Sequence, residues 1–215
     1  PLTLTAGGST ATPMRASSDL YTADTGFDGG EQVRVWMYKN EEQGTETSLY
    51  VVGTPTAGRS ELMLLSGESK IFYPTGDAGI VTLYGLYPTT CETSHTVKYD
   101  QTNTVVGNAN YKASDLMYAK TDAAWTNATE KLALKPNLAF QHQLSKLTLT
   151  VVKTKSVSQI EKVRMVNTKR SVTGIDITRT GMTLGTPTSA TGETEADGDN
   201  KDEILLLKDG ELQTL

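Results

Sequence analysis

Residues 138–151 read Leu-Ala-Phe-Gln-His-Gln-Leu-Ser-Lys-Leu-Thr-Leu-Thr-Val, and this stretch decides the fold class. Its apolar residues alternate with polar ones, which is typical of a strand with one buried face. The apolar positions are even over residues 138–144 and odd over residues 147–151. Because a shift of one residue turns side chains to the other face of a strand, the change at Ser145-Lys146 predicts a bulge, a bend or a transfer between sheets.

The chain has 215 residues, a length that fits one large or two small domains. We place an N-terminal β-sandwich domain at residues 1–140 and the start of a C-terminal β-sandwich domain at residues 141–215. The second part holds about five expected strands, fewer than the ~7 of a typical closed sandwich. We therefore expect an all-β chain of two tandem antiparallel sandwiches, the second of them incomplete, and a natural chain that continues.

Alternation of period two recurs along the chain between turn residues. It predicts strands at residues 2–5, 33–38, 48–52, 61–65, 70–73, 80–87, 95–99, 131–134, 163–166, 172–178, 182–184 and 204–207. Gly7-Gly8 is expected to end the first strand, and the stretch after Tyr118 that contains Trp125 is expected to be looser. Residues 158–166 fit a short helix or a turn into a strand. The expected core residues are Val33, Val35, Val81, Leu83, Leu116, Leu138 and Phe140.

Composition and charge exclude several classes of protein. The net charge of −5 argues against a general nucleic-acid binder, because neutralising phosphates requires a basic face. A single cysteine excludes an intramolecular disulfide framework and a Cys-rich zinc site. The apolar runs are only a few residues long, too short to span a membrane.

The candidate chemical groups favour no catalytic, cofactor or metal site. Cys91 and His95 are four residues apart, but the segment fits a loop leading into a strand, where that spacing does not favour a catalytic pair. His142 shares a face with Phe140, which favours a hydrogen-bonded histidine over a metal ligand. The acidic residues 193–203 lack the EF-hand pattern and fit a solvated loop, with calcium binding as the alternative.

Two further patterns have a structural and a functional interpretation. Asn127-Ala128-Thr129 matches the N-glycosylation pattern, which we interpret as chance. Strand aromatics either pack between strands or form a sugar-binding platform, and we favour packing. They are Trp36, Tyr38, Tyr50, Tyr73, Tyr84, Tyr87 and Trp125.

The N-terminal strand is followed by residues 9–24, which are rich in Ser, Thr and Ala and are expected to be exposed and flexible. Arg15 is the only basic residue before Arg34, and Ala16 after it leaves the peptide bond sterically open. These features leave two interpretations open, a processing site and an incidental arginine.

Five segments, in order, resemble the fimbrillin (Mfa-like) family of Bacteroidetes surface pilins. They are Phe-Asp-Gly-Gly-Glu-Gln-Val-Arg-Val at 27–35, Phe-Tyr-Pro at 72–74, Val-Thr-Leu-Tyr-Gly-Leu-Tyr-Pro at 81–88, Ser-Asp-Leu-Met-Tyr-Ala at 114–119, and Leu-Ala-Phe-Gln-His-Gln-Leu-Ser-Lys-Leu at 138–147. Glu31 departs from the family pattern, which has Asp there. Beyond residue 150, the chain resembles the family only in being β-rich.

The resemblance implies two transthyretin-like β-sandwich domains, export as a lipoprotein to the cell surface, and a role as a pilus subunit, anchor or tip. It implies no catalytic residues. An Arg-specific protease would cut between Arg15 and Ala16, and another subunit's strand would replace the strand of Leu2 and Leu4. The implied partners are other pilin subunits, that protease, and host or bacterial surface ligands. The alternative function is a surface adhesin that binds a glycan or host ligand as a monomer.

Overall fold

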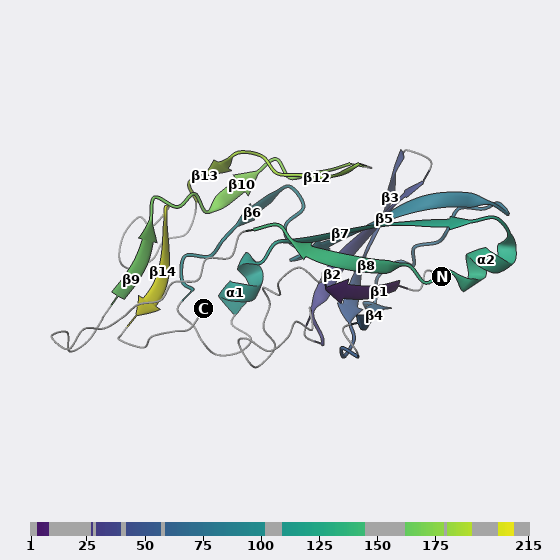
Figure 1. Cartoon of the computed structure of the whole chain (residues 1–215), viewed down its shortest axis with the longest axis horizontal. Helices are drawn as coiled ribbons and strands as arrows, with labels where there is room; N and C mark the ends of the chain where they lie inside the picture. Colours follow the sequence, from purple (N-terminus) through teal and green to yellow (C-terminus); the bar gives the residue numbers. More distant parts are fainter. Residues whose placement is uncertain are drawn as a thin grey trace.

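The computed structural model shows an elongated, mostly β-stranded chain (Figure 1). It describes residues 4–8, 27, 29–39, 42–56, 59–101, 109–144, 162–178, 180–190 and 202–208. Strands in this part pair antiparallel, except for one parallel pair of strands and one isolated parallel bridge. The expectation of an all-β, antiparallel fold is confirmed. The helices in the described ranges are too short to cross a membrane.

The first half of the chain forms a curled sheet that closes on itself. The strand order is β1-β4-β3-β2-β5-β7-β8, and β8 also pairs with β1. The strands are β1 (Leu4–Gly8), β2 (Gln32–Lys39), β3 (Glu42–Val52), β4 (Arg59–Leu64), β5 (Gly79–Tyr87), β7 (Met117–Trp125) and β8 (Asn137–His142). Alternation gives this sheet an inner face, since β2 buries Val33, Val35 and Met37 while Arg34 and Trp36 between them are less buried.

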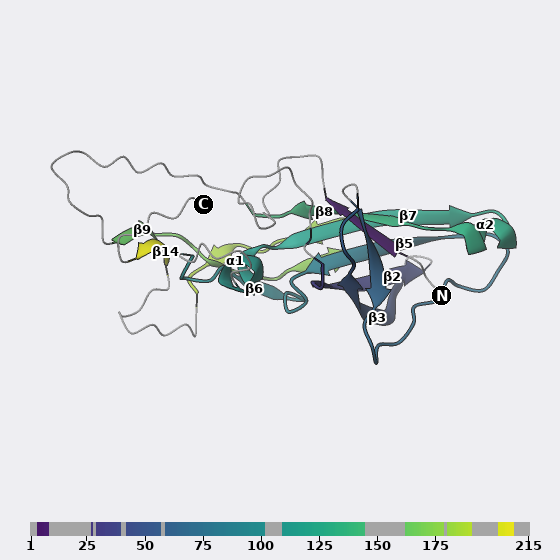
Figure 2. The same ribbon diagram turned by 90° about the horizontal axis from the view of Figure 1, so that it is seen from below.

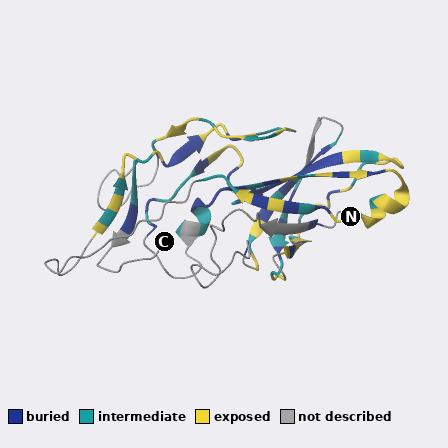
Figure 3. Cartoon of the chain, viewed as in Figure 1, coloured by how far each residue is buried: buried dark blue, intermediate teal, exposed yellow. Residues whose placement is uncertain are grey.

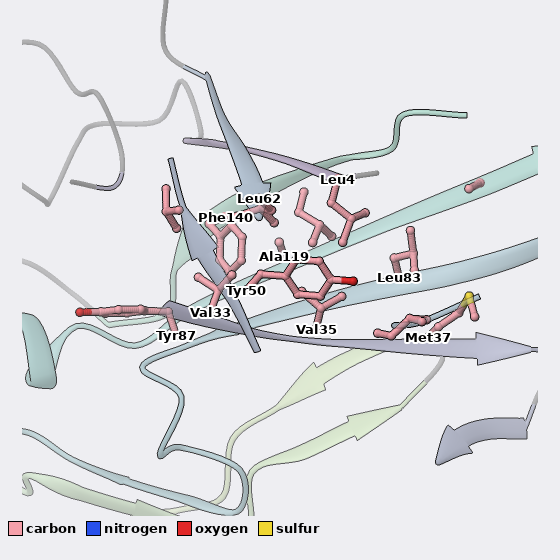
Figure 4. Close-up of a cluster of buried hydrophobic side chains, with 14 of the residues drawn as sticks. Leu4, Val33, Val35, Met37, Tyr50, Leu62, Leu83, Tyr87, Ala119 and Phe140 are labelled. Carbon is pink, nitrogen blue, oxygen red and sulfur yellow. The ribbon is translucent and has the colours of Figure 1, made fainter. Parts of the chain in front are cut away.

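The core lies inside this curled sheet; burial alternates along β4 and β8, whereas β5 is buried at every position from Val81 to Tyr87 (Figure 3). Figure 4 shows side chains from β1, β2, β5 and β8 meeting in one cluster. All seven residues expected in the core are buried: Val33, Val35, Val81, Leu83, Leu116, Leu138 and Phe140. Six of them belong to the one hydrophobic cluster inside the sheet, and Leu116 belongs to a second cluster described below.

Four expectations in the first half were wrong. Residues 70–73 form no strand, although Ile71 is buried and Phe72 exposed. Side chains hold this segment against β3 instead: the Ser48 hydroxyl donates to the Ser69 carbonyl, and the Glu68 carboxylate accepts from the Leu49 amide at 3.2 Å. Residues 70–73 have the alternating pattern of a strand, but they form no strand in the structure.

The stretch containing Trp125 is not loose but is the strand β7, paired with β5 along its whole length. Its buried positions include Ala119 and Ala123, and alanine is a weak signal of a strand. The predicted end of the first strand at Gly7-Gly8 was also wrong, because β1 continues through both glycines.

The expected strand at 131–134 falls largely within helix α2 (Ala128–Ala133). Its N-terminus is capped reciprocally. The Asn127 side chain accepts from the Glu130 amide at 2.9 Å, and the Glu130 carboxylate accepts from the Thr126 amide at 2.7 Å. The first contact satisfies an amide that the first helical turn leaves unpaired, and the second satisfies the amide just before the cap; together they favour the helix over a strand.

The second half of the chain forms small sheets beside the first (Figure 2). The strands are β9 (Lys162–Val166), β10 (Ser171–Thr173), β11 (Asp176–Thr178), β12 (Gly181–Thr183), β13 (Pro187–Thr188) and β14 (Glu203–Lys208). The expected strand at 172–178 is divided at Gly174, whose φ of +72° breaks the extended run. For residues 158–166, the described part is strand. Ser145-Lys146 lies outside the described residues.

The chain between β5 and β7 contributes to this second half. It contains β6 (Ser94–Thr96), which pairs with β10, and helix α1 (Ala109–Ser114). A second buried cluster joins Leu86 and Leu116 from the first sheet and its flank to Val172 and Ile175. The boundary near residue 140 therefore stays a prediction, with residues of both halves packed across it.

Candidate functional site

The candidate site is the slot between β4 and β8, which β1 fills. β1 runs antiparallel to β4, with Leu4 opposite Leu62, and parallel to β8, with Gly8 opposite Phe140. It is the strand that joins the two edges of the sheet (Figure 1). Without β1, both neighbours would present unpaired main-chain groups along this edge.

Leu4 holds β1 in the slot by burial. Its side chain is fully buried and points into the cluster that contains Leu62 and Phe140 (Figure 4). Leu138, on the other neighbouring strand, is also fully buried. Burial of one leucine side chain contributes about 2 kcal/mol, so the side chain of Leu4 makes a modest contribution that another strand could reproduce.

The Gly8 end of the slot is dominated by one aromatic ring. Phe140 extends across Gly85 of β5, where an added Cβ would meet the ring's Cε1 at 3.0 Å and its Cζ more closely still. Gly85 pairs with Ala119 on β7. The ring is therefore flanked by residues with little or no side chain, and it takes the space that larger neighbours would need.

Phe27 packs against the same ring. The Phe27 and Phe140 rings meet edge to face, with centroids 4.9 Å apart, and the Phe27 and Tyr87 centroids are 5.6 Å apart. Residues 9–26 connect Gly8 to Phe27, so both ends of this connection meet Phe140. Phe27 was not among the residues expected in the core; its position before the Gly29-Gly30 turn was the available signal.

The predicted processing and exchange residues are described only in part. Leu4 is in β1, as the sequence predicts, and is buried. Leu2, Arg15 and Ala16 lie outside the described residues. The processing site and the exchange of the first strand stay predictions.

Charged residues lie at the start of β2, shortly after Phe27 in the chain. Lys112 of α1 contacts the Glu31 carboxylate at 3.4 Å, and the Tyr87 hydroxyl donates to the same carboxylate at 3.4 Å. Arg34 of β2 contacts Glu92 at 3.0 Å. These contacts tie the start of β2 to the excursion between β5 and β7.

Cys91 and His95 are in contact through a hydrogen bond between their side chains. His95 Nε2 is 2.9 Å from the Ser114 carbonyl oxygen, which can only accept, so this nitrogen carries the proton. His95 Nδ1 then accepts from the Cys91 thiol at 2.9 Å. Burial raises the pKa of the Cys91 thiol to about 11, so the thiolate needed for nucleophilic attack is scarce at neutral pH.

His142 is bound to a carboxylate. Its Nδ1 lies 2.7 Å from Asp115 Oδ1, and the Asp115 side chain is 8% exposed. This is the hydrogen-bonded histidine that the sequence favoured. Among the described residues, no three His, Cys, Asp or Glu side chains are grouped as metal ligands.

The remaining candidate residues have structural contacts. Asn127 caps α2. Tyr38, Tyr50, Tyr84, Tyr87 and Trp125 are buried, with Tyr38 and Tyr84 rings 4.9 Å apart, so packing explains these strand aromatics. Of the acidic residues 193–203, only the last two are described. They pair with basic residues, Asp202 with Lys169 and Glu203 with Arg164.

Comparison with known proteins agrees with this architecture. Two solved structures from Bacteroides align with almost the whole chain, each described as a "putative cell adhesion protein". The one from Bacteroides uniformis ATCC 8492 is 19% identical with a TM-score of 0.56, covering 97% of this chain and 70% of its own. The one from Bacteroides ovatus ATCC 8483 is 15% identical with a TM-score of 0.52, covering 96% and 77%.

At these identities, the two structures support the fold. A search of curated proteins finds no significant match. The model of the fimbrillin-like family, in contrast, matches residues 15–214, nearly the entire sequence. The chain belongs to the fimbrillin-like family.

Proposed function

We propose that this protein is a structural subunit, anchor or tip of a bacterial surface pilus, and that it assembles by exchange of strand β1. The observation that carries the proposal is the position of β1. This short strand completes the first sheet between β4 and β8, yet it is connected to the next described residue, Phe27, only through residues 9–26.

The proposed trigger is proteolysis after Arg15. Arg15 lies within the connection between β1 and Phe27, and it is the only basic residue before Arg34. A cut between Arg15 and Ala16 would separate β1 from the rest of the chain covalently. An Arg-specific protease is therefore the proposed processing partner, acting at the cell surface.

Loss of residues 1–15, which include Leu2 and the strand β1 with Leu4, would create two defects at once. The facing main-chain groups of β4 and β8 would lose their hydrogen-bond partners, and the apolar surface around Leu62 and Leu138 would meet water. A strand from another subunit repairs both defects by β-augmentation. This gives polymerisation a driving force without a catalytic step in the pilin.

The proposed role is structural and non-enzymatic, and the proposed location is the cell surface after export as a lipoprotein precursor. Family membership supports it, as does the burial of Cys91, which raises the pKa of its thiol to about 11. A monomeric adhesin for a glycan or host ligand is the second candidate. The description of both similar structures as putative cell adhesion proteins favours keeping it.

Two proteases distinguish a processing site at Arg15 from an incidental arginine. The wild-type protein, treated briefly with an Arg-specific protease, should release residues 1–15 and then form multimers, detected by mass spectrometry and size-exclusion chromatography. The matched Arg15→Lys protein should resist that protease but respond to trypsin, which also cuts after lysine. Equal assembly of an uncut Arg15→Ala protein would contradict strand exchange triggered by proteolysis.

A further inference from the structure

We propose that the peptide bond between Arg59 and Ser60 on β4 is a second cleavage site for the Arg-specific protease, protected while a strand fills the slot and accessible when the slot is empty. The inference rests on the proposed cleavage at Arg15 and the proposed exchange of β1. It specifies the fate of a processed subunit that receives no new strand.

Arg59 offers the side chain that such a protease recognises. It is the first residue of β4, and its side chain is exposed. The connection that precedes it from β3 includes Thr54 and Thr56, which are exposed as well. Exposed loop tips are the positions at which proteases preferentially cut a folded chain.

One side of the bond is held by main-chain hydrogen bonds to the end of β3 and the connection after it. The Thr56 amide donates to the Arg59 carbonyl at 2.7 Å, and the Arg59 amide donates to the Thr56 carbonyl at 3.1 Å. The Gly53 amide donates to the Glu61 carbonyl at 2.8 Å. None of these hydrogen bonds involves β1, so the loss of β1 leaves them in place.

The other side of the bond is covered by β1. Successive residues of a strand direct their main-chain groups to opposite edges, so Ser60 directs its amide towards β1. This amide nitrogen belongs to the bond that the protease would cut. β1 lies beside β4 at this point, with Ala6 opposite Ser60 and Gly7 opposite Arg59 (Figure 1).

The strand in the slot therefore sets how easily the bond opens. A protease binds its substrate as an extended chain with free main-chain groups, so it cuts a paired strand only after local opening. With β1 in place, the start of β4 must separate from two neighbours. With the slot empty, β4 is an edge strand, and only the hydrogen bonds to Thr56 and Gly53 have to open.

This difference removes subunits that stay empty. A strand from another subunit would pair with β4 and restore protection of the bond. A cut after Arg59 would separate β4 covalently from β3, so the slot would lose the continuity of one of its edges. The protease that starts assembly would thus also eliminate processed subunits that fail to assemble.

Arg164 provides an internal reference for cleavage that does not depend on the slot. It is exposed, lies on β9 opposite Leu205 of β14, and contacts Glu203 at 2.8 Å. In the pairing of the described strands, β9 and β14 form a sheet of their own, apart from β1 and β4. Cleavage after Arg164 therefore reports general unfolding.

Time courses of digestion with an Arg-specific protease, followed by mass spectrometry, test the second site. Protein cut at Arg15 and freed of residues 1–15 at low concentration should be cut after Arg59 about tenfold faster than the uncut Arg15→Lys chain. Addition of a synthetic peptide of residues 1–15 should restore protection, and an Arg59→Lys protein should show no such cut. Equal rates of cleavage after Arg59 with the slot empty and filled would overturn the proposal.

A second comparison does not require cleavage at Arg15. In the Arg15→Lys chain, Leu4→Ala removes a fully buried side chain from β1 and should loosen this strand in the slot. Cleavage after Arg59 should become about tenfold faster, whereas cleavage after Arg164 should keep its rate. Met63→Ala, which removes an exposed side chain from β4, should change neither rate. An equal increase after Arg59 and Arg164 in the Leu4→Ala protein would contradict protection by β1.

The two experiments separate this inference from the proposed function. If Leu4→Ala accelerates the cut after Arg59 but residues 1–15 cannot be removed from the processed chain, protection by β1 stands and strand exchange is wrong. If the processed chain loses residues 1–15 and forms multimers but Arg59 resists cleavage in the empty monomer, strand exchange stands and the second cleavage site is wrong.

Discussion

The ring of Phe140 on β8 lies across Gly85 on β5, close enough that the glycine has no room for a Cβ. This relationship links two strands that are separated in the sheet by β7. It explains how a single aromatic residue fills the end of the core next to β1. The same ring contacts Phe27 and is paired with Gly8, so it connects the core to the slot.

Replacement of Gly85 by alanine should destabilise the protein by about 1–3 kcal/mol, the usual cost of overpacking a core. The cause is the collision between the new methyl group and the Phe140 ring. Gly29→Ala is the matched control, because a Cβ there would make ordinary contacts with Thr54 at 3.5 Å. Urea unfolding measures both, and equal stabilities for the two variants would contradict this packing.

Replacement of Phe140 by alanine should lower the free energy of unfolding by about 3–5 kcal/mol, as for a full core residue. The ring is 2% exposed, whereas Phe72 is 52% exposed and provides a control of the same chemistry. Phe72→Ala should change stability by less than about 1 kcal/mol. A loss below about 1 kcal/mol for Phe140→Ala would mean that the ring is not a core residue.

Stability should fall as the pH drops below the ordinary pKa of histidine, about 6.5, and His95 should contribute to this fall. Burial lowers the pKa of His95, so the folded state holds it neutral while the unfolded state takes up a proton. Folding is then opposed by protonation below the unfolded-state pKa. The His95→Gln protein should show a flatter dependence between pH 7 and 5 in urea titrations; slopes identical to wild type would refute this.

A fragment of residues 141–215 should not fold alone. In the full chain, β10 pairs with β6, and the Leu205 amide donates to the Tyr99 carbonyl at 2.8 Å. The fragment lacks both partners as well as Leu86 and Leu116 of the shared cluster. Circular dichroism and thermal unfolding should show no cooperative transition for the fragment. A cooperative transition would support an independent second domain beginning near residue 140.

The sequence predicted the strands whose buried positions are Val, Leu or Phe. The alternation of Val33, Val35 and Met37 predicts a strand with these three side chains on its buried face, and β2 has this arrangement. β7 was missed because alanines occupy two of its buried positions. α2 was missed because it is only six residues long and has no buried residues, so it shows no helical repeat of apolar positions. The signal for it in the sequence is the pair of side chains that cap its N-terminus.

The candidate site was predictable only in part, because it depends on contacts between distant segments. Leu4 was expected in a strand, but its neighbours on β4 and β8 are about 60 and 130 residues away, and local alternation does not identify such pairs. Gly8 was interpreted as a turn, since glycine in a strand is ordinarily unfavourable. In the structure Gly8 lies in β1, paired with Phe140 of β8.

Hydrogen exchange of the β4 and β8 amides, before and after removal of residues 1–15, tests strand exchange most directly. Before cleavage, the amides that face β1 should be protected. After cleavage and removal of the released peptide at low protein concentration, those amides should exchange quickly. Protection should return on multimerisation or on addition of the peptide. Unchanged protection of β4 and β8 in monomeric protein that has lost residues 1–15 would contradict the account.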